Sequence, residues 1–215
     1  MGCDIHAHIE YYQIPASGES TYTHTFATDI DLGRNYALFA LMAGVRGMCT
    51  PIVKPRGLPQ SPPISYSVSY DYYCFVVDDL ESIEGLKIAA YKSFQRSVIS
   101  REAAEQLISQ GELYHNQEKT LIRYPGYHTP SWLTLSELLK VRQKYLLDAI
   151  QYDSDMRGKR RRNAIDLIED CSPEELMGHN FGDVEYVSLN ATIASMMILE
   201  RHTNYRSRLV FWFDS

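Results

Sequence analysis

The amino-acid sequence predicts a single α+β domain spanning residues 1–215, in which several helices cover a small mixed or antiparallel sheet that contains both termini. Two observations predict this class. The chain begins and ends with segments that alternate like strands, and the sequence between them holds capped helical segments without an internal repeat or a linker. A chain of 215 residues is long enough to bury a substantial core.

The first ten residues read as a strand with two different faces. Successive strand residues point to opposite sides, so every second side chain shares a face. One face is apolar and suits a core: Cys3, Ile5, Ala7 and Ile9. The other face carries groups that bind metals or transfer protons: Asp4, His6, His8 and Glu10. We therefore expect a bound ligand or ion on the second face.

The last nine residues repeat this pattern and form a second predicted strand. Its β-branched and aromatic residues favour an extended conformation. Arg208, Trp212 and Asp214 share one face with Val210. If the two terminal strands pair antiparallel, Asp214 lies near Asp4 and the arginines near Glu10. We expect the two polar faces to lie on the same side of the sheet.

Five segments have the patterning or the caps of helices: residues 34–45, 100–111, 134–150, a segment opened by Ser172 and Pro173, and 185–201. Thr134 and Glu137 form a capping box at the start of the third helix. We expect Asp31 to cap the first helix and Gly47 to end it.

Other segments are predicted to be extended or irregular. Residues 65–77 alternate serine with tyrosine and are expected to form one or two strands. Residues 15–25 are rich in turn formers and are expected to be a loop. Residues 157–162, with five basic side chains, are expected to form a solvated loop.

Charge and composition exclude some classes of function. A net charge of −6 argues against general nucleic-acid binding and against binding to anionic membranes. No apolar run approaches the ~18 residues of a membrane span. The start has no secretory signal, and the four cysteines are scattered, so we expect a cytoplasmic protein with reduced thiols. Self-association into a homo-oligomer is left open.

Several residues are candidates for binding a phosphorylated ligand. Arg46 and Arg56 lie in a basic loop broken by glycine and proline, over residues 46–63. His128 and Ser131 precede the helix that opens at Thr134, and free N–H groups at such a helix start favour an anion. Arg208 is the third candidate phosphate binder. Trp212, with the many tyrosines, offers a surface on which a base can stack.

The residues support four alternatives. In the first, His6 and His8 bind Zn²⁺, Mn²⁺ or Mg²⁺ together with Glu10, Asp214 or His128, and the ion activates water. In the second, His6 paired with Asp4 or Glu10 is a general base without any ion, and His128 is the acid. In the third, the protein binds a nucleotide without cleaving it and withholds it from a host receptor. In the fourth, it is a structural or interaction protein without a small-molecule site.

The His6-x-His8 motif on a first strand resembles that of the amidohydrolase and polymerase-histidinol-phosphatase superfamilies, where the two histidines are metal ligands. By this resemblance His6 and His8 would be ligands here. The similarity covers these few residues and implies no shared fold.

The chain as a whole resembles an uncharacterised family of small proteins from bacteriophages and related mobile elements. The resemblance rests on the opening Met-Gly-Cys-Asp-Ile-His and the closing Arg-Leu-Val-Phe-Trp-Phe-Asp. It also covers residues 36–46, the Arg-Gly-Leu-Pro of 56–59, and 128–137. Family members often carry an acidic residue after Gly-Leu-Pro, where this chain has Gln60 and Ser61. The resemblance implies a phage accessory role in the host bacterial cytoplasm, including an anti-defence role, and assigns no activity.

Together these patterns favour hydrolysis of a small nucleotide or phosphorylated ligand over binding alone. Asp4, His6 and His128 are the expected catalytic residues. The expected metal ligands are His6, His8, Glu10 and Asp214. The expected substrate-binding residues are Arg46, Arg56, Ser131, Arg208 and Trp212.

Overall fold

A computed structural model of the chain describes most of the segments that carry these predictions. The described residues are 2–14, 23–47, 49–59, 62, 64–72, 75–77, 98–115, 121–122, 126–157, 184–202 and 204–215. The predicted helix opened by Ser172, residues 158–162 of the predicted basic loop and residues 15–22 of the predicted loop 15–25 lie outside this set. The described ends of these two loops differ from the prediction, because Arg157 belongs to a helix and residues 23–25 belong to a strand. Among the helices in the described ranges, none is long and apolar enough to cross a membrane.

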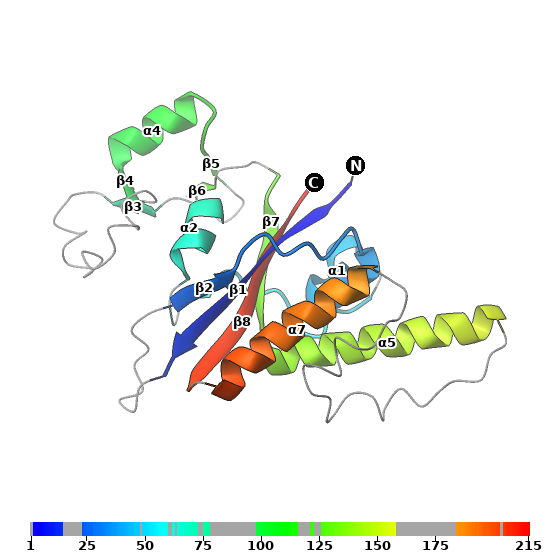
Figure 1. Cartoon of the computed structure of the whole chain (residues 1–215). Coiled ribbons are helices and arrows are strands. Elements are labelled where there is room, and N and C mark those ends of the chain that lie inside the picture. The colour runs from blue at the N-terminus through cyan, green and yellow to red at the C-terminus, as the bar shows by residue number, and fades with distance from the viewer. Residues whose placement is uncertain are drawn as a thin grey trace.

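A four-stranded antiparallel sheet forms the centre of the fold (Figure 1). Its strands, in spatial order, are β2 (Thr23–Ala27), β1 (Asp4–Gln13), β8 (Tyr205–Asp214) and β7 (His128–Thr134). The two terminal strands are therefore the central pair. The fold is α+β with both termini in one sheet, as the sequence predicts.

The terminal strands pair antiparallel over their full length. Asp4 lies opposite Asp214, His6 opposite Trp212, and Glu10 opposite Arg208. Directly opposed residues in a sheet point to the same face. The predicted register and the predicted common face of the two strands are both confirmed.

Helices cover one face of the sheet (Figure 1). They are α1 (Tyr36–Ala43), α5 (Leu135–Arg157) and α7 (Val184–His202). The odd-numbered residues of β1 and β8 pack against them, and their side chains include Ala7, Ile9, Leu209, Phe211 and Phe213. Each of these five side chains is at most 2% exposed, so this layer is the main core.

The opposite face is covered by α2 (Tyr66–Tyr72) and the chain before it. Val68 and Tyr72, spaced one helical turn apart, pack against Val210 and Trp212. Residues 65–77 were expected to form strands, and this is wrong for most of the segment. The serine–tyrosine alternation suits a strand, but packing of the i, i+4 pair on the sheet stabilises a helix. Within the described part of this segment, Phe75–Val77 forms a strand, β3.

Smaller elements lie beyond this second layer (Figure 1). Strand β3 pairs in parallel with β4 (Val98–Ser100), which leads into α4 (Arg101–Ser109). Ser100 caps this helix by accepting a hydrogen bond from the Ala103 N–H, as predicted. Strands β5 (Tyr114–His115) and β6 (Leu121–Ile122) form a short hairpin pair.

The helix ends show where local sequence signals hold and where they fail. The Thr134–Glu137 capping box is present, since Glu137 accepts from the Thr134 N–H at 2.8 Å. The cap of α1 is Asn35, not Asp31, because the Asp31 carboxylate accepts from the Gly33 N–H in a turn instead. Helix α1 ends at Gly44 (φ +70°), before the expected Gly47, and Val45–Gly47 form the 3₁₀ turn η1.

Candidate functional site

The face of the sheet that carries the even-numbered residues of β1 holds the predicted site residues, and we call it the histidine face. His6 and His8 lie on it beside Trp212, whose ring is stacked 5.8 Å from His6 and 5.1 Å from His8 between centroids. Alternate strand residues are ~6.5–7 Å apart, so both imidazoles can contact one indole. Trp212 is fully buried, and its ring contacts both imidazoles.

His6 is held by the carboxylate of the other terminal strand. Its Nε2 lies 3.1 Å from Oδ2 of Asp214, while Oδ1 of Asp214 accepts a hydrogen bond from the Asp4 N–H. The side chains of His6 and Asp214 are 33% and 26% exposed. Tyr127 lies beside His6, with ring centroids 5.1 Å apart. The predicted proximity of His6 and Asp214 is thus present as an oriented imidazole–carboxylate pair that solvent reaches.

A pocket of about 270 Å³ opens beside His6. Its lining combines β1 with the segment that follows β2: Asp4, Ile5, His6, Asp29, Ile30, Asp31, Gly33 and Arg34. Arg34 donates to both carboxylate oxygens of Asp4, with Nη2 at 2.7 Å from Oδ2. The hydrogen bonds from Arg34 hold the pKa of Asp4 below its usual value.

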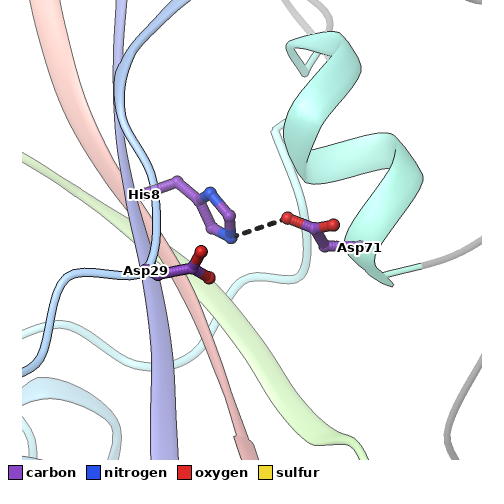
Figure 2. Close-up of side chains that lie close together, drawn as sticks. All are labelled: His8, Asp29 and Asp71. Carbon is purple, nitrogen blue, oxygen red and sulfur yellow. Dashed lines mark ion pairs between the residues drawn. The ribbon is translucent and has the colours of Figure 1, made fainter.

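His8 lies deeper on the same face and faces two aspartates (Figure 2). Its Nε2 is 3.6 Å from Oδ2 of Asp71. One ligand atom each of His8, Asp29 and Asp71 can be chosen so that all three lie within 4.8 Å of one another. An imidazole nitrogen with two carboxylate oxygens is a donor set that divalent cations use. We call these three residues the His8 cluster.

Three separate elements bring the His8 cluster together. After β2 the chain turns back over β1, where the Ile30 N–H donates to the Ala7 carbonyl at 3.0 Å. Asp29 precedes this contact with φ +50°, a left-handed conformation that aspartate tolerates better than most residues. Asp71 is next to Tyr72, whose ring packs on Trp212 at 5.2 Å and so fixes the end of α2 over the sheet.

Burial controls the charge of His8. The side chain is 1% exposed, and its desolvation lowers the pKa to about 4; nearby Asp29 raises the pKa and His6 lowers it. The imidazole is therefore neutral near pH 7, the form that ligates metals. Among the described residues its Nδ1 finds no hydrogen-bond partner.

Glu10 and Arg208, predicted as a metal ligand and a phosphate binder, bind each other instead. They form an ion pair with Nε 2.7 Å from Oε2, and both side chains are at most 1% exposed. Glu10 also accepts from the Ser65 N–H, and Arg208 donates to the Pro62 carbonyl. A buried pair with these further partners is structural, because neither charge reaches a ligand.

The other predicted phosphate binders do not converge on the pocket. Arg56 donates to Glu137 and to the Trp132 carbonyl, and its guanidinium lies 3.4 Å from the centre of the Trp132 ring. Arg46 is exposed and lies over Tyr36. These side chains were predicted to gather because their charges are close in sequence, but each is positioned by its own contacts.

The pocket beside His6 also lacks three further predicted site residues: His128, Ser131 and Trp212. His128 and Ser131 lie in strand β7, which leads directly into α5. The ring of His128 stacks on Phe213, the residue after Trp212, so His128 lies on the face opposite His6. Ser131 is fully buried opposite Phe211, in the helix-covered layer. Trp212 packs in the second core, and its burial excludes stacking on a ligand.

Sequence reasoning missed Asp29, Asp71 and Arg34. Asp71 carried a usable signal, because the i, i+4 spacing of Val68 and Tyr72 marks a helix that would turn Asp71 along the sheet. Asp29 and Arg34 carried none, since only the return of the chain over β1 places them beside the histidines. Comparison of the chain with protein-family models, curated proteins and solved structures returned no match.

Proposed function

We propose that the protein hydrolyses a small phosphorylated or nucleotide ligand in the pocket beside His6. The observation that carries this proposal is the His6–Asp214 pair: an imidazole that solvent reaches, fixed by a carboxylate 3.1 Å away, in the wall of a pocket. An oriented imidazole of this kind is the commonest general base in enzymes.

The pairing of His6 with Asp214 determines which ring nitrogen of His6 accepts the proton. When Nε2–H of a neutral His6 donates to Asp214, Nδ1 carries the lone pair and accepts a proton from water. The water oxygen then bonds to phosphorus, and the bond to the leaving group breaks. The proton on Nδ1 is available to the leaving oxygen. Asp214 keeps the imidazole in the required tautomer, so it is a positioning residue.

Arg34 is the side chain best placed to hold a phosphate. Among the described residues that line the pocket Arg34 is the single lysine or arginine, and His6 and Asp29 line the same pocket. It takes over the role that the sequence suggested for Arg46, Arg56 and Arg208. Its present partner Asp4, predicted as a catalytic residue, orients it by two hydrogen bonds.

The same pocket supports a second candidate, a protein that binds a nucleotide without cleaving it. Tyr127 beside His6 favours this reading because an aromatic ring offers a surface to a base. The resemblance to the phage family favours an accessory, anti-defence role in the host cytoplasm for either candidate. A hydrolase would destroy a host signalling nucleotide, and a binder would withhold it.

One experiment separates hydrolysis from binding. The protein is incubated with a panel of mono-, di- and cyclic nucleotides, with and without Mn²⁺, and then boiled, and the released compounds are separated by chromatography. A hydrolase returns product in amounts that exceed the protein, whereas a binder returns intact nucleotide. If the protein releases neither product nor intact nucleotide with any member of the panel, both candidates are contradicted. The fourth alternative, an interaction protein without a small-molecule site, then remains.

For the nucleotide that is cleaved, His6→Gln is expected to lower kcat by about 10²–10⁴-fold, because that is the usual contribution of a general base. The matched control is His24→Gln, which changes an exposed histidine of the same sheet that stacks on Tyr11. The control is expected to keep the wild-type rate. A His6→Gln variant that turns over normally would show that the pair is not the base.

A further inference from the structure

The lining of the pocket does not suit a phosphate without further help. Asp4, Asp29 and Asp31 line it against the one arginine, Arg34. Like charges repel, so the wall of the pocket that carries Asp29 disfavours an anionic ligand. A positive charge bound at Asp29 would reverse this repulsion, and the His8 cluster contains Asp29.

The geometry of the His8 cluster is close to that of an ion site. Ligand atoms around a divalent metal with bonds of about 2.0–2.2 Å lie about 3–4 Å from one another. In the cluster Nε2 of His8 is 3.6 Å from Oδ2 of Asp71, and all three ligand atoms lie within 4.8 Å. Asp29 is exposed, so an ion can enter from the pocket side.

His8 provides an independent observation that points to a ligand. Its ring is 99% buried and aimed at both carboxylates, yet 3.6 Å is too long for a hydrogen bond to Asp71. A buried polar ring normally has its nitrogens satisfied, because an unmatched one costs about 1–3 kcal/mol. Among the described residues Nδ1 is the ring nitrogen that is buried without a partner. Nε2 is the nitrogen that faces the carboxylates, where a cation would contact Nε2 and neutralise both carboxylates at once.

We propose that His8, Asp29 and Asp71 bind one divalent metal ion, Mn²⁺ or Zn²⁺, in the wall of the pocket beside His6. This ligand set differs from the predicted one, in which His6, Glu10 and Asp214 joined His8. The donor set selects the ion: two carboxylates suit Mn²⁺, the imidazole suits Zn²⁺, and an all-oxygen site would be needed to prefer Ca²⁺.

The inference rests on the proposed function for its purpose, though not for its test. Three protein ligands leave coordination positions open for water or for a phosphate oxygen. The ion would draw the phosphate to the pocket and polarise its P–O bonds, while His6 accepts the proton of the attacking water. The ion site therefore restricts the proposed substrate to a phosphate ester or anhydride whose oxygens bind a metal.

The test measures the metal alone. Chelator-treated protein is titrated with MnCl₂ or ZnCl₂ by calorimetry, in the wild type and in Asp29→Asn and Asp71→Asn. Asparagine keeps the size of each side chain and tolerates the left-handed backbone at residue 29. The control is Asp31→Asn, which removes a charge from the same pocket outside the cluster and keeps an oxygen for the Gly33 N–H.

The wild type and the control are expected to bind about one ion per chain. The two cluster variants are expected to bind at least about 10–100-fold more weakly, since even changes outside the ligand shell cost that much. Absence of stoichiometric binding in the wild type would overturn the proposal. Equal affinity in all four proteins would overturn it as well, because the ion would then bind elsewhere.

A second measurement needs no variant of the cluster. In ¹⁵N-histidine-labelled wild type, one equivalent of Zn²⁺ is expected to shift the imidazole signals of His8 and to leave those of the exposed His24 in place. Unshifted His8 signals would overturn the ion site. Metal binding without hydrolysis of any nucleotide supports the ion site and removes the proposed function. Hydrolysis that persists in the presence of chelator, with no metal bound, supports the proposed function and overturns the ion site.

Discussion

At the scale of single residues, Glu10 and Arg208 were predicted to bind a metal and a phosphate, but their buried ion pair stabilises the fold. Both residues are charged, lie on the histidine face and are directly opposed in the sheet. Their burial and their extra partners, the Ser65 N–H and the Pro62 carbonyl, tie the covering segment before α2 to the sheet. The pair thereby helps to hold this segment, and α2 after it, on the sheet face that carries His8.

This role predicts a large effect on stability. Arg208→Met is expected to lower the free energy of unfolding by about 3–5 kcal/mol, because it leaves the charge of Glu10 buried and unpaired. Replacing both residues by methionine is expected to recover part of the loss, since an apolar pair needs no charge compensation. Urea unfolding followed by circular dichroism measures both variants.

The matched control is the exposed pair of Lys144 and Asp148 on α5, four residues apart. Asp148→Asn there is expected to change stability by less than about 0.5 kcal/mol, because solvent screens exposed pairs. If Arg208→Met were as mild as this control, the structural role of the buried pair would be wrong.

At the scale of elements, the start of α5 shows how a local signal survives in the fold. Thr134 and Glu137 were predicted as a capping box, and the structure adds Arg56, which donates to both carboxylate oxygens of Glu137. Burial on its own raises the pKa of Glu137, but the hydrogen bonds from Arg56 and Thr134 outweigh it and the net pKa is lowered. The carboxylate is thus favoured over the acid in the folded state.

This lowered pKa predicts a pH dependence of stability. Since the folded pKa lies below the unfolded value of 4.5, Glu137 contributes fully above pH 4.5 and its contribution is lost as the pH falls through the folded pKa. Glu137→Gln is expected to cost about 1 kcal/mol at pH 7 and to flatten the stability profile in that acidic window. The exposed Glu105 of α4 supplies the control, Glu105→Gln. Parallel profiles for wild type and Glu137→Gln would contradict this account.

Two of the errors at element scale have one physical cause. The cap of α1 and the conformation of residues 65–77 were read from local preferences, and tertiary contacts decided otherwise. Asn35 takes the cap that Asp31 was expected to take, and α2 forms because Val68 and Tyr72 find Trp212. Short segments with mixed signals are set by what they pack against, whereas the strongly alternating terminal strands keep their predicted form.

At the scale of the whole molecule, the sequence predicts the α+β fold, the pairing of the termini and the shared face. This succeeds because a two-residue period fixes which side chains share a face, so pairing of the two termini brings their polar residues to one side of the sheet. Half of the site follows from it, since His6, His8 and Asp214 lie on that face. The other half comes from Asp29, Arg34 and Asp71, which reach it through turns and helix packing that no local pattern encodes.

The central claim is that the two ends of the chain build one catalytic pair, His6 and Asp214. A double-mutant cycle in kcat/KM tests it most directly, with His6→Gln, Asp214→Asn and the double variant acting on the nucleotide that the wild type cleaves. Residues that act as a unit lose their effect together, so the double variant is expected to be no slower than the slower single variant. If the two losses multiply instead, the residues act independently, and the proposed site at the paired termini is contradicted.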